Sequence, residues 1–207
     1  MSNQDRVPRT DRGSNTRLRL LEAAEQVFAE RGYHDASIVK ITEAAGVAQG
    51  TFYIYFASKQ EIFDEVVLDL NHRVRQAMAE ASSQGTSRSD AERRGFEAFF
   101  RFTGEHPALY RIIRQAEFVS PHTLRLHYQR IVEGYVEGLT RAKEAGEVAD
   151  LDPVVVAWAL MGTGELIGMR YVLWDDKRRI PQGVFEEMMR FVRRGLGADH
   201  GDEDSNQ

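Results

Sequence analysis

The stretch from Ser37 to Phe63 reads SIVKITEAAGVAQGTFYIYFASKQEIF and carries the pattern that decides the fold. Ser37 can cap a helix whose apolar positions recur every three to four residues, which is the spacing of one helical face. Gly46 follows at the place where a helix commonly ends in a left-handed residue. A second, very short helix is expected after this turn, over residues 48–54.

The residues that follow complete a three-helix pattern. Phe52 and Phe56 lie four apart, so they are expected to pack inward and to leave the other face of the short helix exposed. Ser58 and Glu61 have the spacing of a capping box, which predicts a new helix from Lys59. Two helices joined by a glycine turn, with a third close behind, are the parts of a helix-turn-helix that places its second helix in the DNA major groove.

The segment resembles the DNA-binding domain of the TetR family of bacterial transcriptional regulators over about residues 16–65. The resemblance rests on residues at fixed spacing: Gly32-Tyr33, Ser37, Ile41, Ala45-Gly46-Val47, Gly50-Thr51-Phe52-Tyr53, Tyr55-Phe56 and Ser58-Lys59. Three positions depart from the family pattern. Thr42 replaces the usual alanine, Ala48 replaces a common serine cap, and Ile54 replaces a more usual polar or aromatic residue. The changes at Ala48 and Ile54 leave the operator sequence open.

Helical patterns continue along the rest of the chain, and no β pattern or internal repeat is apparent. Helices are expected over residues 16–31, from 59 to about 82, from 153 to about 174, and from 181 to 195 or 197. Ser89 and Glu92 form a second capping-box spacing, which predicts the start of another helix. The family resemblance implies an all-α fold of about nine helices, with an N-terminal three-helix domain and a larger C-terminal domain.

The predicted organisation has four parts. They are a basic flexible arm (1–15), the helix-turn-helix domain (16–62), a ligand-binding and dimerisation domain (63–198), and a disordered acidic tail (199–207). The formal net charge of −5 does not oppose DNA binding, because residues 1–59 are close to neutral and the excess acid lies after them. Arginines before the first helix can lie along phosphate or reach a minor groove, or they can belong to a merely solvated tail.

Composition excludes several classes of protein. The chain has 207 residues and no cysteine, which rules out a disulfide scaffold and thiolate chemistry. The longest apolar run, Val154 to Met161, is too short to span a bilayer, and the polar N-terminus lacks a signal-peptide core. We therefore expect a cytoplasmic protein without a membrane partner. Glu117, His127 and Glu165 could be drawn as a catalytic or metal cluster, but the sequence has no H-x-x-x-H pair, no nucleophile motif, no glycine phosphate loop and no cysteine. We therefore expect that the protein is not an enzyme and holds no metal and no cofactor.

DNA contacts are assigned by position in the motif. Glutamine can pair with adenine, threonine can meet thymine or either base, and glycine lets the backbone come close. Tyrosine, serine and lysine can bond phosphate. Ser37 also has a simpler role as a helix cap, and Tyr53 as a half-buried ring. The predicted DNA-binding residues are Arg17, Ser37, Thr42, Gln49, Gly50, Thr51, Tyr53, Tyr55 and Lys59.

A ligand pocket is expected in the body of the chain, because ionisable groups stand among aromatic residues there. Ordinary core with solvated charges is the simpler alternative for each. The predicted lining is Phe99, Phe100, Tyr110, Arg114, Glu117, Phe118, His127, Tyr128, Trp158, Met161, Glu165 and Met169. Residues 106–118 are similar to TetR-type regulators of fatty-acid or aromatic-acid breakdown, which implies an acyl-CoA effector; a multidrug-type aromatic compound is the rival.

The last two helices carry apolar residues on more than one face, which predicts a second partner surface. By resemblance they form a four-helix homodimer seam, for which we predict Val155, Ile167, Tyr171, Trp174, Phe185, Met188, Met189 and Val192. A two-fold dimer implies an inverted-repeat operator on double-stranded DNA. The resulting hypothesis is a repressor released by a small-molecule effector. An activator of the same family, and more remotely a helical enzyme or an adaptor for protein contacts, are the alternatives.

Overall fold

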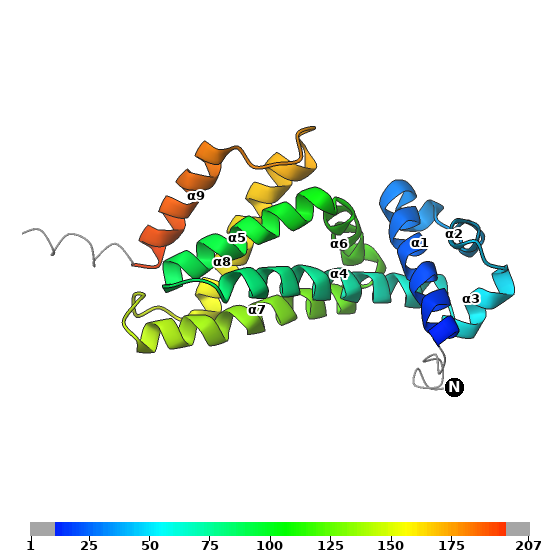
Figure 1. Ribbon diagram of the computed structural model, residues 1–207, viewed down its shortest axis with the longest axis horizontal. Helices are drawn as coiled ribbons and strands as arrows, with labels where there is room; N and C mark the ends of the chain where they lie inside the picture. The colour runs from blue at the N-terminus through cyan, green and yellow to red at the C-terminus, as the bar shows by residue number, and fades with distance from the viewer. Residues whose placement is uncertain (1–10, 198–207) are drawn as a thin grey trace, which may run out of the picture. The chain divides into compact units, whose positions relative to one another are not determined.

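The structure, a computed structural model, describes residues 11–197, and this range is helical and contains no β-strand (Figure 1). The elements are α1 (Asp11–Asp35), α2 (Ile38–Ala45), α3 (Gln49–Tyr55), α4 (Lys59–Ser82), α5 (Arg88–Glu105), α6 (Ala108–Val119), α7 (Pro121–Glu144), α8 (Pro153–Gly168), η2 (Met169–Leu173) and α9 (Gln182–Gly195). The predicted all-α class is confirmed. Helix α1 begins at Asp11 and not at residue 16, so residues 11–15 are helical and do not belong to a flexible arm. The rest of the predicted arm and the predicted tail lie outside the described residues.

The chain forms two compact units. The first contains the described residues up to Asn71 together with residues 107–127, which supply α6 and the first part of α7. The second contains residues 72–106 and the described residues from Tyr128 onward. The domain boundary predicted at residue 62 differs from this packing, because α6 returns to pack against α1 and makes the first unit discontinuous in sequence. None of the described helices is long and apolar enough to cross a membrane.

Aromatic rings fill the core of the first unit. Phe28 and Phe63 are fully buried and meet edge to face, with ring centres 5.2 Å apart. Tyr33 completes the cluster, 5.1 Å from Phe63. Gly32 has φ 76° and ψ 164°, a conformation that suits glycine, and it breaks α1 where the sequence predicted an end. The break lets Tyr33 turn back onto the core.

The short helix α2 has the ends that its sequence predicts. The Ser37 hydroxyl accepts a hydrogen bond from the backbone N–H of Lys40 over 3.2 Å, as an N-cap does. Gly46 has φ 63° and ψ 40°, the left-handed conformation of a helix C-cap. These two caps fix the length of α2 and the turn that leads into α3.

The N-cap of helix α5 is Ser87, two residues before the predicted cap at Ser89. The hydroxyl of Ser87 accepts from the backbone N–H of Asp90 over 3.2 Å, and the Asp90 carboxylate accepts from the N–H of Thr86 over 3.1 Å. The prediction that Ser89 and Glu92 form the capping box is therefore wrong. Glu92 instead points inward, where it is only 2% exposed.

The core of the second unit joins α5, α7, α8 and α9. Its buried members are Phe96, Phe100, Val132, Leu139, Ala157, Leu160, Phe185, Met188, Met189, Val192 and Leu196. Asp152 caps α8 as expected, accepting from the N–H of Val154 over 2.8 Å. The predicted helix over 153–174 changes to π-helical bonding at Met169, since the N–H of Trp174 donates to the Met169 carbonyl over 3.1 Å.

Candidate nucleic-acid interface

Helix α3 turns one face into the first unit and the other face to solvent. Phe52 and Phe56 are fully buried with ring centres 5.5 Å apart, as their spacing predicted. Ile54 lies two residues, or about 200° around the helix, from Phe52 and is 63% exposed. Tyr53 is 51% exposed, and Gln49 is exposed as well. The outward face thus offers an amide, a phenol and a branched apolar side chain to a partner.

The first turn of α3 is open to close approach. Ala48 occupies the N-cap and supplies no side-chain hydrogen bond, as expected from its substitution for serine. Apart from its chain neighbours and the backbone of its own helix, no described atom lies within 4 Å of the place that a Cβ on Gly50 would take. Thr51 and Tyr55 are half-buried at the edges of the outward face. A large partner can therefore come up to the backbone at Gly50 without displacing part of the protein.

Lys59 is held within the first unit. Its ammonium donates to the carbonyl oxygen of Tyr33 over 2.7 Å and to that of Ala36 over 2.8 Å. The same ammonium lies 4.3 Å from the centre of the Tyr33 ring. The predicted phosphate contact by Lys59 is therefore corrected, because its donors already satisfy carbonyls that the break at Gly32 leaves open.

Thr42 is also engaged inside the protein. It is 3% exposed, and its hydroxyl donates to the carbonyl of Ile38 at 3.0 Å or of Val39 at 2.9 Å. A buried hydroxyl bonded to its own helix has no access to phosphate, so the predicted contact by Thr42 is wrong. Ser37 is half-buried and serves as the N-cap of α2, which was the simpler of its two predicted roles.

Two arginines of α1 stabilise the same unit. Arg17 forms an ion pair with Glu65, and its guanidinium carbon lies 5.2 Å from the centre of the Phe56 ring. Its side chain remains 30% exposed, which leaves an edge for a phosphate. Arg19 donates to the carbonyl of Ala45, at the C-terminal end of α2. These contacts fix the helices that carry α3.

A family model described as "Bacterial regulatory proteins, tetR family" matches residues 20–66. The chain is also 31% identical over 190 residues to YdgC, an uncharacterized HTH-type transcriptional regulator of Bacillus subtilis, with 89% of this chain and 94% of YdgC covered. The chain belongs to the TetR family. It is therefore a DNA-binding transcriptional regulator, and the predicted family and role in transcription regulation are confirmed.

Solved structures share the TetR fold. GusR of Salmonella enterica is 25% identical with a TM-score of 0.77, and the match covers 91% of this chain and 98% of GusR. FadR of Bacillus subtilis, solved in complex with stearoyl-CoA, is 20% identical with a TM-score of 0.76, covering 87% of this chain and 98% of FadR. These relatives are regulators and not enzymes, in agreement with the predicted class.

The predicted pocket residues of this TetR-family chain fall in both units. In the first unit, Tyr110 is buried, whereas Arg114 and Glu117 are exposed and Phe118 is 82% exposed. Their exposure corrects the assignment of Arg114, Glu117 and Phe118 to an enclosed lining. His127 is 4% exposed and belongs to the interior of this unit.

His127 forms a buried polar pair with Asn71. The Asn71 Nδ2 donates to the carbonyl oxygen of His127 over 3.0 Å and lies 3.0 Å from its Nδ1. Burial lowers the pKa of His127 to about 4. The ring is therefore neutral at physiological pH, and Nδ1 can accept the bond from the amide.

In the second unit the remaining predicted residues form packing and one polar contact. The Tyr128 hydroxyl donates to the Glu165 carboxylate over 3.0 Å, and the Trp158 ring centre lies 6.0 Å from that of Tyr128. Phe100 is buried in the core, whereas Phe99 and Met161 pack partly against it. Met169 is half-buried at the start of η2. Of the two predicted roles, pocket lining and ordinary core, Phe100 has the role of ordinary core.

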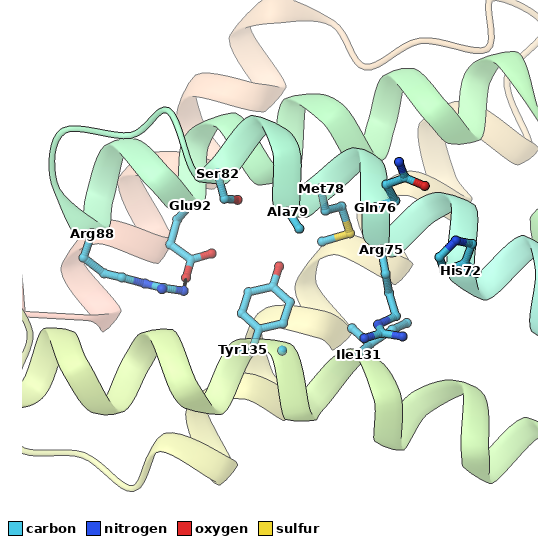
Figure 2. A pocket seen from close by; sticks show the side chains of 11 residues that line it. His72, Arg75, Gln76, Met78, Ala79, Ser82, Arg88, Glu92, Ile131 and Tyr135 are labelled. Carbon is cyan, nitrogen blue, oxygen red and sulfur yellow. Dashed lines mark hydrogen bonds and ion pairs between the residues drawn. The ribbon is translucent and has the colours of Figure 1, made fainter.

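A cavity that the sequence did not predict lies between α4, α5 and α7 (Figure 2). Its volume is ≈ 290 Å³, and none of the twelve predicted pocket residues lines it. One signal for it was available, because Gly134 interrupts a helical pattern, and a Cβ there would meet nothing within 4 Å outside its own helix and its chain neighbours. The lining residues are His72, Arg75, Gln76, Met78, Ala79, Ser82, Arg88, Glu92, Ile131, Gly134 and Tyr135.

The predicted dimer residues divide according to exposure. Val155 and Trp174 are each 64% exposed, whereas Ile167 and Tyr171 are half-buried. The α9 residues Phe185, Met188, Met189 and Val192 are buried in the core of the same chain, so their assignment to a dimer seam is wrong. The exposed apolar residues that were missed are Val154, Leu166 and Phe191, together with Trp158, which was assigned to the pocket.

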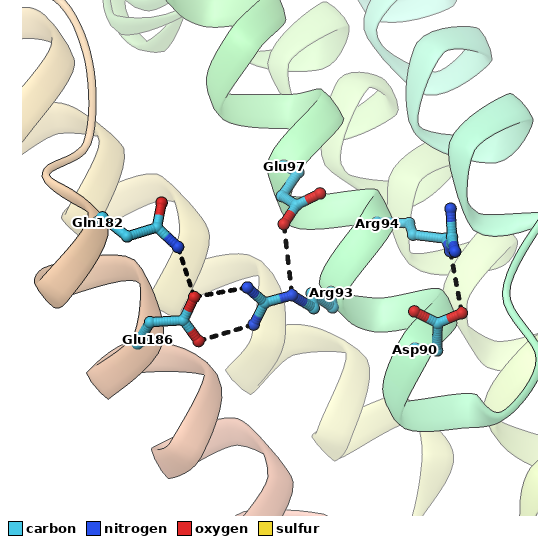
Figure 3. Close-up of polar contacts among 6 residues, drawn as sticks. All are labelled: Asp90, Arg93, Arg94, Glu97, Gln182 and Glu186. Carbon is cyan, nitrogen blue, oxygen red and sulfur yellow. Dashed lines mark hydrogen bonds and ion pairs between the residues drawn. The ribbon is translucent and has the colours of Figure 1, made fainter.

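A bidentate ion pair holds α9 against α5 (Figure 3). Arg93 donates to the two Glu186 carboxylate oxygens over 2.8 and 2.5 Å, and Gln182 donates to the same carboxylate over 2.5 Å. The bonds from Arg93 hold the pKa of Glu186 below its usual value. The guanidinium carbon also lies 5.0 Å from the centre of the Phe185 ring. This contact adds a polar tie beside the apolar face of α9, which is buried in the core.

Proposed function

We propose that this TetR-family regulator is a repressor that binds an inverted-repeat operator as a homodimer and leaves it when a small-molecule effector binds. The observation that carries the DNA-binding part is the outward face of α3. Its exposed side chains and the open approach at Gly50 suit insertion into a major groove. A regulator of this kind works on chromosomal DNA, hence in the bacterial cytoplasm.

The proposed interface contains the predicted DNA-binding residues that are accessible and leaves out Thr42 and Lys59, which are engaged within the protein. Gln49 and Thr51 would meet base edges, Gly50 would admit the DNA backbone, and Tyr53 and Tyr55 would donate to phosphates. Ile54, exposed at 63%, joins them as an apolar base contact. Arg17 and Ser37 stay at the edge of the interface, where each also has a structural bond.

The apolar outer surface of the second unit supports the homodimer. Val154, Val155, Trp158 and Leu166 expose between 47% and 64% of their area on α8, although Ala157 and Leu160 of the same helix are buried. A helix that is apolar on both sides requires a second surface to cover it. A second copy of this chain would supply the same apolar face across a two-fold axis.

Two effector classes remain in the proposal. The first class is an acyl-CoA, because the FadR structure named above was solved with stearoyl-CoA. A hydrophobic or aromatic compound is the second class. In either case DNA affinity falls only by the difference between the effector's affinities for the DNA-bound and released forms, typically about 1–3 kcal/mol. An activator that needs its effector for DNA binding would show the opposite response.

The test is fluorescence anisotropy with the full chain and with DNA upstream of its own and neighbouring genes. Repression predicts tight, salt-dependent binding to an inverted repeat that one effector class weakens. Binding that the effector strengthens would favour the activator. The proposed interface would be contradicted if the chain bound neither these DNAs nor a random duplex library at low salt.

A further inference from the structure

The cavity between α4, α5 and α7 holds polar groups that DNA binding does not use (Figure 2). Met78, Ile131 and the ring of Tyr135 supply apolar walls. Figure 2 shows Tyr135 extending from α7 toward α4, with its hydroxyl between Glu92 and Met78. All of the lining residues belong to the second unit. The cavity is therefore a property of one compact unit.

One end of the cavity carries a buried ion pair. Glu92 is 2% exposed and pairs with the guanidinium of Arg88. Burial raises the pKa of Glu92, and the neighbouring Arg88 opposes that rise. The Nε of Arg88 is buried and has no hydrogen-bond partner among the described residues. Because the two charges compensate each other, this end favours a neutral hydrogen-bonding group over a second charge.

The Tyr135 hydroxyl is available to a ligand. It makes no hydrogen bond with the residues that the structure describes. Burial raises the pKa of Tyr135, and the nearby Glu92 raises it further, so the group stays a phenol that can donate. Tyr135 is half-buried at the cavity wall, and a ligand oxygen that accepts its hydrogen would take the place of water there.

The other end of the cavity carries an uncompensated positive charge. Arg75 lines it from α4 and lies beside Ile131 in Figure 2. Within residues 13–197, Arg75 forms no ion pair and no hydrogen bond. Arg88 and Glu92 cancel each other, so the charged lining has an excess of one positive charge, that of Arg75. A ligand with one negative charge at this end would balance it.

We propose that this cavity binds a compact monocarboxylate, with its carboxylate on Arg75 and a hydroxyl or carbonyl oxygen at its far end accepting from Tyr135. A volume of ≈ 290 Å³ lies at the lower limit of small-molecule sites, which span about 300–1,000 Å³. That size suits a hydroxy- or oxo-substituted aromatic acid and excludes an entire acyl-CoA. The inference rests on the proposed function, since it names the effector class of the same regulator.

An adjoining groove supplies a route into the cavity. The groove shares Ala79, Ser82, Arg88 and Gly134 with the cavity and is open to solvent, with a volume of ≈ 550 Å³. Gly138 on α7 leaves room for the Arg88 guanidinium, because a Cβ there would collide with it. Arg88 therefore stands where the groove meets the cavity.

The experiment is isothermal titration of the full chain, without DNA, with hydroxy- and oxo-substituted benzoates and phenylacetates. Each acid is compared with its neutral amide. We expect at least one acid to bind with one site per chain, and its amide to bind about tenfold to a hundredfold more weakly, as hydrogen bonds to charged groups imply. Stearoyl-CoA serves as the large competitor and is expected not to displace the acid from this cavity.

Three variants locate the site. Arg75→Gln should reduce binding of the acid to the level of its amide and leave the amide unchanged, and Tyr135→Phe should weaken both severalfold. Arg101→Gln, on an exposed position of α5 outside the cavity, is the matched control. No binding by any acid, or equal binding by wild type and Arg75→Gln, would overturn the inference. Operator binding is measured on the same preparations. Operator binding without acid binding would contradict the monocarboxylate site but not the proposed DNA-binding function.

Discussion

The ammonium of Lys59 lies 4.3 Å from the centre of the Tyr33 ring and donates to the carbonyl oxygen of the same residue over 2.7 Å. This double contact ties the start of α4 to the end of α1, just after the break at Gly32. A lysine that sequence position alone assigns to phosphate is thus a structural residue of the DNA-binding unit.

Replacing Lys59 with methionine should lower the free energy of unfolding by about 2–3 kcal/mol, because a cation–π contact and charged hydrogen bonds are lost together. Urea denaturation measures this loss, with Lys177→Met at an exposed loop position as the control. If Lys59→Met had an unchanged urea midpoint and its operator binding depended less steeply on salt, Lys59 would instead be a phosphate contact.

Removal of the Tyr53 side chain should abolish operator binding without unfolding the protein, since Tyr53 is 51% exposed on the outward face of α3. Tyr53→Phe removes only the hydroxyl and should weaken binding about fivefold, the effect of one lost hydrogen bond of about 1 kcal/mol. Anisotropy gives the affinities, and circular dichroism checks the helices. Normal operator binding by Tyr53→Ala would contradict the assignment.

Ile54 should read a thymine methyl group in the operator, because an exposed branched side chain gains from covering that methyl in the major groove. Deoxyuridine lacks the methyl, so its placement at the contacted position of each half-site should weaken binding roughly fourfold per half-site. The Ile54→Ala variant should not distinguish the two DNAs. Equal sensitivity of wild type and Ile54→Ala to every such replacement would contradict the contact.

His127 should make stability depend on pH. Its pKa is about 4 in the folded chain, against an ordinary value of 6.5. Between these values the unfolded chain binds the proton and the folded chain does not, so stability is lost as the pH falls from 6.5 to 4, by up to roughly 3 kcal/mol. Urea denaturation across this range should give a flatter profile for His127→Gln. An identical slope in the variant would assign the effect to other groups.

A charge on the outer face of α8 should break the dimer. Val155 is 64% exposed, and Val155→Glu would place a carboxylate in the proposed seam without touching the core. Analytical ultracentrifugation should then show a monomer at concentrations where wild type is a dimer. Gln129→Glu, at an exposed position of α7, is the control. A variant that remains fully dimeric would place the seam elsewhere.

The sequence predicted what local patterns determine. The caps at Ser37 and Gly46, the break at Gly32 and the burial of Phe52 and Phe56 all follow from residue type and spacing, and the structure has each of them. The roles of Thr42 and Lys59 could not be predicted in this way. Position in a motif does not show that a donor is already bound, by its own helix in the case of Thr42 and by carbonyls distant in sequence in the case of Lys59.

The same limit explains the errors on α9 and in the pocket. An apolar stripe such as that of α9 looks alike in sequence whether it faces its own chain or a second copy. In this chain the stripe is buried in the core formed with α5, α7 and α8, which are distant from it in sequence. The cavity residues Arg75, Glu92 and Tyr135 come from three helices, so no local pattern links them.

The return of residues 107–127 to the first unit restricts how this chain can be recombined. A chimaera that took only the N-terminal residues up to Asn71 would leave behind α6, which covers α1. The transplanted DNA-binding unit would then expose the apolar surface of α1 that α6 normally covers. In the chimaera, a helix of the other regulator would have to pack against that surface. A graft of DNA specificity onto another regulator therefore needs both segments, or must be confined to the outward residues of α3.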